Sequence, residues 1–220
     1  MSTISPGRGL FITFEGGEGA GKTTQLRLLS ARLRSRGLPV VETAEPGGTL
    51  IGAQIRRVLL DTANQEISAM AELLLVFAAR AQNIEQTILP ALAAGSVVLC
   101  DRFTDSTMAY QGVARGLGAD VVRQVEAIAC RGLTPGLTIY LDIDPEAGLL
   151  RARARNASSG ENHETRLDNQ SVAFHEKVRS AFLDLARKEP RRIRVVQAAR
   201  DPETVALEIG SLLAPLLAGR

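Results

Sequence analysis

The segment that most constrains this chain runs from Gly16 to Thr23 and reads GGEGAGKT, directly after a short apolar run, Leu10 to Phe14. It matches the phosphate-loop pattern GxxxxGK[ST] at every fixed position. Glycines at four positions let the backbone turn so that successive N–H groups face one anion, with the N-terminus of the next helix behind them. A glycine-rich turn that binds nothing is the structural alternative, but the order strand, loop, helix favours nucleotide binding. The expected ATP contacts come from Gly16, Gly17, Glu18, Gly19, Ala20, Gly21, Lys22, Thr23 and Thr24.

Two side chains of this loop have expected chemical roles. Lys22 is a point charge that reaches the β and γ phosphates, and the Thr23 hydroxyl is placed to ligate the Mg²⁺ that bridges them. GTPases, ATPase motors and small-molecule kinases all carry such a loop. The loop therefore predicts the ligand class and leaves the reaction open.

Length and composition are those of one α/β domain with a sizeable core, since the chain has 220 residues and 45% hydrophobic content. The formal net charge of +2 gives no reason to expect a nucleic-acid partner, although arginines gather near residue 153 and between Arg187 and Arg194. The two cysteines, Cys100 and Cys130, lack metal-ligand spacing and are expected to be buried thiols. The chain has no apolar stretch of membrane-spanning length, and we expect a soluble cytoplasmic protein.

Short apolar runs alternate with longer helical patterns, which is typical of a parallel sheet covered on both faces. The pattern predicts a three-layer α/β fold with a five-stranded sheet as a single domain. Expected strands are Leu10 to Phe14, Val40 to Thr43, Val97 to Cys100, Thr138 to Leu141 and Ile193 to Val196. Expected helices include one at Leu26 to Leu33, one at Ile51 to Leu59, one kinked helix or two over Ala69 to Gly95, and later ones at Val121 to Ala129, Glu146 to Arg155, Ser171 to Arg187 and Glu203 to Leu217.

The other motifs follow strands, where ligands collect in such sheets. The turn EPGGT at 45 to 49 follows the second strand, and DRFTDSTMAYQG at 101 to 112 follows the third. Asp101, at the end of an apolar strand, is the natural partner for Mg²⁺, and Arg102 can hold a second anion. Read structurally, this pair is a helix cap or a surface ion pair.

These segments together resemble bacterial thymidylate kinases. The matching stretches are FEGGEGAGKTT at 14 to 24, EPGGT at 45 to 49, ELLLVFAARAQ at 72 to 82, DRFTDSTMAYQG at 101 to 112 and YLDIDPEAGLLRARAR at 140 to 155. The resemblance implies the fold of phosphate-loop nucleoside monophosphate kinases with a mobile lid at about 151–168. It also implies transfer of the γ-phosphoryl of ATP to dTMP, giving dTDP for dTTP biosynthesis.

The resemblance assigns roles residue by residue. Lys22, Arg102 and a lid arginine surround the transferred phosphoryl group, whose charge must be neutralised for attack by an anionic acceptor. Arg56 holds the dTMP phosphate with Arg102, and Glu18 contacts the 3′-hydroxyl region and the metal. The remaining acceptor pocket is formed by Glu45, Arg80, Ser106, Thr107, Tyr110 and Gln111, with Arg80 and Thr107 on the thymine edge and Tyr110 crowding the 2′ position.

The catalytic arginine of the family lies either in the phosphate loop or in the lid. The variable loop positions here contain no arginine, so the resemblance implies a lid arginine, Arg153 or Arg155, with Arg166 as the candidate across the loop. Arg151 and Arg166 are both expected to contact the ATP. A solvated helix face is the alternative reading of the RARAR segment. The polar tract Asn156 to Glu164 lengthens the lid.

Two positions depart from the family pattern. Ala44 stands where an arginine is usual. The base-stacking aromatic is expected at Val76, whereas Phe77 is one residue later on the same helix; we expect Phe77 to face the base, with Val76 as the alternative. The resemblance also implies a cis peptide bond at Glu45-Pro46.

Two other functions are weighed against the kinase. A related nucleotide kinase with altered acceptor specificity fits the departures at Ala44 and Val76. A regulatory ATPase or switch that binds nucleotide without an acceptor is the second; a switch GTPase would carry an NKxD segment, and the chain has none. The resemblance further implies a homodimer, for which the apolar faces of Ala69 to Leu92 and Val121 to Ala129 are available; core burial explains the same residues.

Overall fold

The computed structural model describes residues 9–159, 166–167 and 169–218. In this part of the chain five parallel strands form one sheet in the order β2-β3-β1-β4-β5. Every predicted strand is confirmed, and the observed strands extend one or two residues further. They are β1 Leu10–Gly16, β2 Val40–Ala44, β3 Val97–Asp101, β4 Leu137–Asp142 and β5 Ile193–Gln197.

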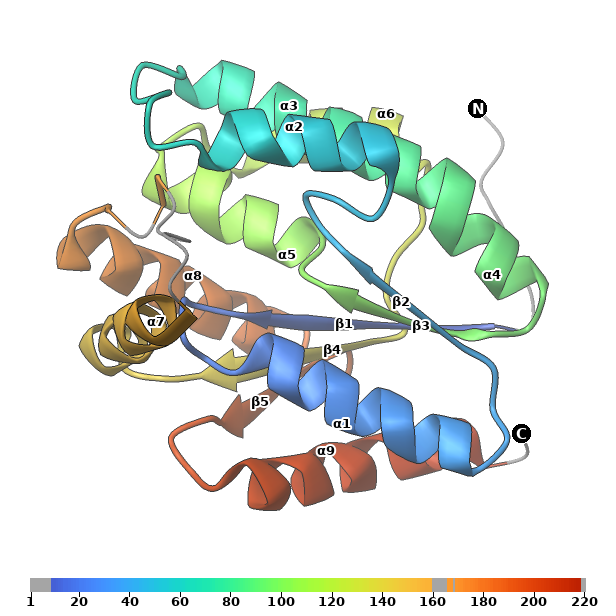
Figure 1. Cartoon of the computed structure of the whole chain (residues 1–220). Helices are drawn as coiled ribbons and strands as arrows, with labels where there is room; N and C mark the ends of the chain where they lie inside the picture. The colour runs from blue at the N-terminus through green and yellow to red at the C-terminus, as the bar shows by residue number, and fades with distance from the viewer. Residues whose placement is uncertain (1–8, 160–165, 168, 219–220) are drawn as a thin grey trace.

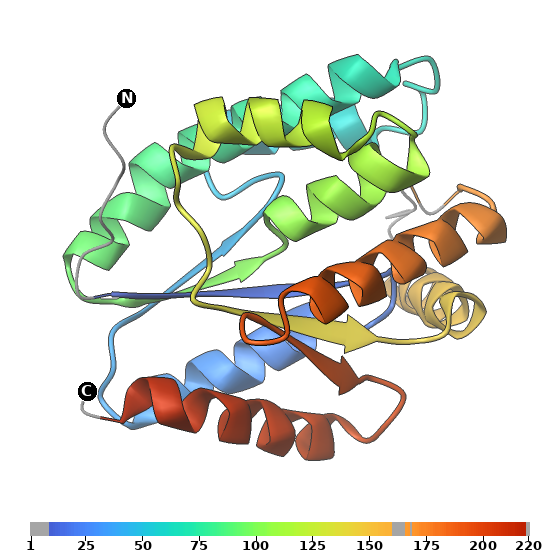
Figure 2. The same cartoon turned by 180° about the vertical axis from the view of Figure 1, so that it is seen from behind.

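Helices cover both faces of the sheet, as Figures 1 and 2 show from opposite sides. Below the sheet in Figure 1 lie α1 (Lys22–Ser35) and α9 (Pro202–Leu217), which enclose one apolar cluster with Ile12 and Phe14 of β1. Phe11, which directly precedes Ile12, points to the opposite face and joins a second cluster, as the alternation of side chains along a strand requires. The predicted three-layer α/β architecture is confirmed.

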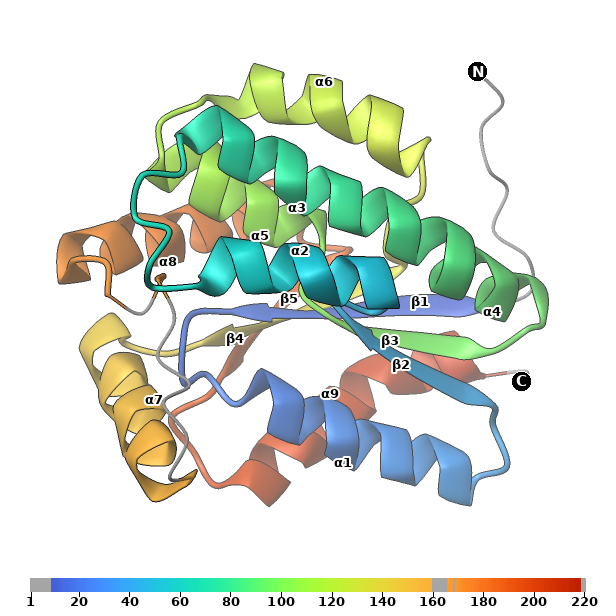
Figure 3. The same ribbon diagram turned by 45° about the horizontal axis from the view of Figure 1, so that its top comes forward.

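The second face carries most of the remaining helices, and Figure 3 shows α2 lying beside α3 there. Each helix forms around an apolar stripe that the sheet or a neighbouring helix buries. Their bounds are α2 Leu50–Leu60, α3 Ala69–Asn83, α4 Leu89–Ala93, α5 Thr104–Thr107, α6 Ala119–Cys130 and α8 Val172–Lys188, with α7 Pro145–Ser159 beyond the ends of the strands.

The segment predicted as one kinked helix or two is helical from Ala69 to Ala93 and is interrupted by a π-helical turn, η1 (Ile84–Ile88). Pro90 follows directly in the first turn of α4. Proline lacks a backbone N–H and clashes with the carbonyl four residues earlier, and a widened turn is one way a helix accommodates it.

A helical segment that the pattern does not predict follows β3. It consists of α5 and a second π-helical stretch, η2 (Met108–Ala114). Threonine, serine, aspartate and glycine are poor helix formers, so local propensity gives no signal here. Ala109 and Tyr110 are buried against Phe174 and Val178 of α8, and this packing supplies what propensity lacks.

Three loops meet where β1, β2 and β3 end, because the carboxyl ends of parallel strands share one edge of a sheet. They are the phosphate loop after β1, the EPGGT turn after β2 and the turn around Arg102 after β3. The expected cis peptide bond at Glu45-Pro46 is confirmed. Among the described residues no helix has the length and apolar character needed to cross a membrane.

Candidate active site

The phosphate loop has the backbone that its glycines predict. Gly16, Gly19 and Gly21 have φ values of 148°, 65° and 87°, a region that favours glycine. Gly19 is also constrained by contact, since a Cβ there would lie 2.0 Å from the carbonyl oxygen of Gly148 in α7. The Lys22 amine folds back over the loop, donating to the carbonyl oxygens of Gly16 at 3.1 Å and Gly17 at 2.9 Å.

Thr23 and Asp101 come together at the edge of the sheet. The Thr23 hydroxyl, in the first turn of α1, donates to Oδ2 of Asp101, the last residue of β3, at 3.0 Å. A hydroxyl and a carboxylate are the hard oxygen ligands that Mg²⁺ prefers. The described residues contain no group of three His, Cys, Asp or Glu that could hold a metal ion, so an ion here would take its other ligands from phosphate oxygens and water.

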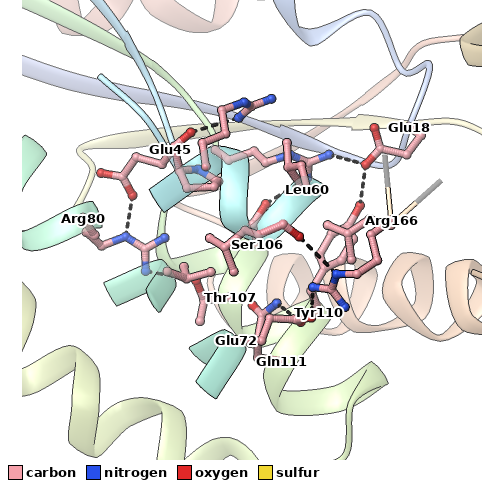
Figure 4. Close-up of a pocket in the computed structure, with 16 residues that line it drawn as sticks. Glu18, Glu45, Leu60, Glu72, Arg80, Ser106, Thr107, Tyr110, Gln111 and Arg166 are labelled. Carbon is pink, nitrogen blue, oxygen red and sulfur yellow. Dashed lines mark hydrogen bonds and ion pairs between the residues drawn. The ribbon is translucent and has the colours of Figure 1, made fainter. Parts of the chain in front are cut away.

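A cavity of about 680 Å³ of empty space, including its open mouth, begins at Glu18 of the loop and runs beneath α2 (Figure 4). Charged groups stand at both ends, and aliphatic side chains from α2 and α3 line it between them. The lining comprises Glu18, Glu45, Pro46, Arg56, Leu59, Leu60, Glu72, Val76, Arg80, Arg102, Ser106, Thr107, Tyr110, Gln111, Arg166 and Leu167.

Arg102 connects the phosphate loop to this cavity. Its Nη1 donates to the carbonyl oxygen of Gly16 at 3.0 Å and to Oγ of Ser106 at 3.1 Å. Its Nη2 pairs with Oε1 of Glu18 at 2.8 Å, and its guanidinium lies over the Tyr110 ring, 5.1 Å from the centroid. Arg102 itself has a φ of 72°, which is uncommon for a residue other than glycine.

Arg56 of α2 faces Arg102 across the mouth of the cavity. Its Nη1 donates to the carbonyl oxygen of Pro46 at 2.9 Å. Burial and the charge of Arg102 both lower the pKa of Arg56, as expected for two cations held close together. An anion between them would relieve this repulsion.

Glu18 is held in its ionised form. Burial alone would raise its pKa, but the positive charges of Arg102 and Lys22 outweigh burial and lower it to about 2. The Tyr110 hydroxyl also donates to Oε1 of Glu18, at 3.2 Å. Glu18 therefore belongs both to the phosphate loop and to the cavity, as its predicted role requires.

At the other end of the cavity, Arg80 is fixed on every side. Its Nε donates to Oε2 of Glu45 at 2.5 Å and its Nη1 to Oγ1 of Thr107 at 2.9 Å. The guanidinium lies between two rings, 4.8 Å from the Phe77 centroid and 5.0 Å from that of Phe103. Burial raises the pKa of Glu45, although the Arg80 charge opposes this shift.

The cavity is lined by Val76 and not by Phe77, the residue expected to face the base. Successive residues of a helix point about 100° apart, so only one of the two can line it. Phe77 is buried in the core cluster of the second sheet face and supports Arg80 from behind.

Arg166 also lies elsewhere than expected. The resemblance places it on the ATP side, but it lines the acceptor cavity and is buried. Its Nε donates to the carbonyl oxygen of Leu59 at 3.1 Å, and its Nη2 forms a short contact with Oε2 of Glu72. Glu72 also accepts from Gln111 at 2.7 Å and from Arg115. The buried Glu72 carboxylate on α3 therefore gives Arg166 an oppositely charged partner.

The other predicted lid residues divide differently. Arg151 donates to the carbonyl oxygen of Ala198 at 3.2 Å and lines a second cavity of about 450 Å³ with Gly21, Thr24 and Arg200. Arg153 is exposed and lines neither cavity. Arg155 belongs to α7, but its side chain and residues 160–165 and 168 of the expected lid lie outside the described part of the structure.

Several cavity residues are not predicted from the sequence. Glu72 carries a usable signal, since it is a lone acid in an otherwise apolar helix face about two turns before Arg80. Leu59 and Leu60 of α2 carry none, because aliphatic residues in an amphipathic helix are also what a core requires, and Leu167 lies in a turn with no distinguishing pattern. Asn83, which donates to Oε1 of Glu45 at 3.0 Å, supports the site from behind and has no distinguishing pattern.

Comparison with known proteins gives one consistent result. The family model for thymidylate kinase matches residues 14–209. The chain is 50% identical to a thymidylate kinase of Deinococcus radiodurans over 202 residues, which cover 92% of this chain and 95% of that protein. It is 52% identical to one of Syntrophotalea carbinolica over 188 residues, covering 86% and 87% respectively. The crystal structure of thymidylate kinase from Ehrlichia chaffeensis matches with a TM-score of 0.74 and 34% identity, covering 94% of this chain and 99% of that one.

Proposed function

The chain belongs to the thymidylate kinase family and phosphorylates dTMP to dTDP with ATP as the donor, and we propose that the residues around the cavity of Figure 4 carry out this transfer. The observation that supports this most directly is that Glu18 belongs to both the phosphate loop and the cavity, and that Arg102, which lines the cavity, bonds to Gly16 and Glu18 of the loop. A donor bound to the loop and an acceptor bound in the cavity would therefore meet at one guanidinium.

The donor side rests on the loop. Its backbone N–H groups and Lys22 hold the phosphates of ATP, and Arg151 lies beside the nucleoside. Thr23 and Asp101, joined by their 3.0 Å hydrogen bond, would hold Mg²⁺, which neutralises charge on the β and γ phosphates when bound.

The acceptor side holds dTMP along the cavity. Arg56 and Arg102 bind its phosphate, while Glu18 and Tyr110 lie against the sugar. Val76 and the leucines of α2 pack on the base, and Arg80 with Thr107 donates to the carbonyl at the thymine edge. Gln111, held by Glu72, closes the same wall.

The transfer itself needs little covalent chemistry from the protein. An oxygen of the dTMP phosphate forms a bond to the γ-phosphorus as the bond to the β-phosphate oxygen breaks, and ADP leaves. Lys22, Arg102 and a lid arginine, Arg153 or Arg155, stabilise the charge on the transferred group. The acceptor is already an anion, so it requires no strong general base.

A coupled ADP-release assay with dTMP, dUMP, dCMP and dGMP tests the function. We expect selective turnover with dTMP. Turnover with another acceptor would instead establish a kinase of altered specificity, which the departures at Ala44 and Val76 make the second candidate. ADP release that is independent of any acceptor would point to a regulatory ATPase.

We also propose that two copies pair through α3 and α6, which form an open apolar groove of about 790 Å³. Leu74 and Ile128 are 52% and 66% exposed there, and burying them needs a matching apolar surface, which a second copy provides. Sedimentation should show a dimer for the wild type and a monomer for Ile128→Glu. The matched control is Leu207→Glu on α9, which is similarly exposed at 62% and should leave the dimer intact.

The free, buried cysteines Cys100 and Cys130 suit a reducing compartment. We propose a cytoplasmic location on this basis and on that of its nucleotide substrates. Fractionation of cells with an antibody to the chain tests it.

A further inference from the structure

Glu15, the residue before the first loop glycine, is a carboxylate with 0% exposure at the end of β1. Alternation along the strand places it on the same sheet face as Phe11 and Thr13, beneath α5. None of the roles described above uses it. A buried carboxylate is costly unless its oxygens are hydrogen-bonded, so its partners indicate what it does.

Within the described part of the chain, the groups that hydrogen-bond to its carboxylate belong to the turn after β3. Oε1 accepts from the main-chain N–H of Phe103 at 2.7 Å and from that of Ser106 at 3.3 Å. Oε2 accepts a short hydrogen bond from the Ser106 hydroxyl. That hydroxyl in turn accepts from Nη1 of Arg102 at 3.1 Å. A continuous relay therefore runs from Glu15 through Ser106 to Arg102.

The turn needs such support for two reasons. Arg102 has the unfavourable φ of 72°, which persists only where surrounding contacts impose it. The helix α5 begins directly afterwards without a side-chain cap from Phe103, and the first N–H groups of a helix lack partners within it. The Glu15 carboxylate supplies acceptors for these groups from below.

Glu15 is not an ion-pair partner in the ordinary sense. Asp105, the nearest acid, is itself held by two hydrogen bonds from Arg192, at 2.7 and 2.8 Å. Burial and the Asp105 charge raise the pKa of Glu15 to about 7, against the opposing charge of Arg102. The charges of Lys22 and Arg80 also interact with the Glu15 carboxylate. Burial and the Asp105 charge make a carboxylate unfavourable at this position. The groups that it does bond to belong to the turn that carries Arg102.

We propose that Glu15 is a positioning residue that orients the Arg102 guanidinium for the acceptor phosphate through the Ser106 hydroxyl, an inference that rests on the proposed role of Arg102. Glu15→Gln keeps the shape but puts an amide donor into the relay. Ser106→Ala keeps the acceptors for Phe103 and removes the relay.

Both variants should weaken dTMP binding, measured by calorimetry, and lower kcat/KM for dTMP by about 10- to 100-fold, since a misplaced group costs up to that much. The KM for ATP should stay within about twofold of wild type, because the loop contacts of Lys22 are untouched. The double variant should be no worse than the poorer single one, as expected for residues acting in one relay. Thr13→Val, on the same strand face but paired with Thr138 at 2.8 Å, is the matched control and should bind dTMP normally.

Equal loss of ATP and dTMP affinity in Glu15→Gln, or wild-type dTMP binding in Ser106→Ala, would overturn the inference. If Glu15→Gln does not fold, Ser106→Ala decides alone. Arg102→Ala distinguishes the proposed role of Arg102 from its positioning by Glu15. Normal dTMP affinity in Arg102→Ala would contradict the role of Arg102 itself. Weakened affinity in Arg102→Ala together with normal affinity in Ser106→Ala would contradict only the positioning through Ser106.

Discussion

At the scale of single residues, the cations of this site differ in how they are held, and Arg80 is the most confined. Two aromatic rings, a threonine hydroxyl and the Glu45 carboxylate surround its guanidinium. A buried charge pair contributes little net stability, but removing one partner leaves the other charge buried and uncompensated. Glu45 therefore matters more for keeping Arg80 in place than for touching the base.

Glu45→Gln should lower the free energy of unfolding by about 3 kcal/mol, measured by urea denaturation. Glu42→Gln is the control on β2, the strand that Glu45 follows, because Glu42 pairs with Arg34 near the surface and should change stability by less than about 1 kcal/mol. Equal effects in the two variants would contradict the assigned role of burial.

The choice between Val76 and Phe77 has a kinetic consequence. Val76→Ala removes two methyl groups from the cavity wall, so the KM for dTMP should rise about fivefold, as expected from roughly 1 kcal/mol of lost apolar contact. Val113→Ala on the exposed side of η2 is the control and should leave it unchanged. A normal KM for Val76→Ala would mean that the base lies elsewhere in the cavity.

At the scale of elements, α7 packs against the phosphate loop at Gly19 and Gly148 and carries the first part of the expected lid, and its described arginines lie in different surroundings. Arg151 is turned toward the second cavity by the Ala198 carbonyl, whereas Arg153 is exposed. Arg166, once a candidate for catalysis, is occupied by Glu72 and α2. The catalytic charge expected from the lid is thus left to Arg153 or Arg155.

Replacing Arg153 and Arg155 together by Ala should lower kcat on the order of 10³-fold if one of them stabilises the transferred phosphoryl group. Replacing Arg187 and Lys188, exposed at the end of α8, removes the same charge elsewhere and should leave kcat normal. Near-normal turnover in the lid variant would show that neither arginine serves in catalysis.

The elements also show where sequence patterns suffice. Strong signals, such as β-branched runs and the glycine spacing of the loop, predicted the sheet and the position of the phosphate loop. The helical segment after β3 was not predictable, because its residues favour turns and only contact with α8 makes it helical. Likewise the pattern restricted the base-facing position to Val76 or Phe77, but the choice depends on the rotation of α3 against its neighbours.

At the scale of the whole molecule, two acids near the loop affect stability in opposite directions as pH changes. The pKa of Glu15 is about 7, above its ordinary 4.5, because of burial and Asp105. The folded state therefore holds a proton that the unfolded chain loses, and Glu15 destabilises the fold as pH rises from about 4.5 to 7. The pKa of Glu18 is about 2, so its contribution is present above 4.5 and is lost as pH falls toward 2.

The wild type should therefore be most stable near pH 5 and lose stability toward pH 8, with each unit of pKa difference worth about 1.4 kcal/mol at most. Urea unfolding at several pH values checks this. Glu15→Gln has no group to titrate at that position, so its free energy of unfolding should fall less between pH 5 and pH 8 than that of the wild type. An equal fall in both proteins would mean that other groups cause it.

Cations across the active site share one kind of partner, the main-chain carbonyl: Lys22 on Gly16 and Gly17, Arg102 on Gly16, Arg56 on Pro46, Arg151 on Ala198 and Arg166 on Leu59. A carbonyl is a neutral dipole, so this contact holds a charged group in place without cancelling its charge, and a phosphate that arrives can take the contact over. Arg102 and Arg166 additionally pair with the carboxylates of Glu18 and Glu72. Carbonyls are also common to all amino acids. Side-chain mutations around the site can therefore alter its shape and selectivity over many generations while these anchors persist, which allows acceptor preference to diverge without rebuilding the charge arrangement.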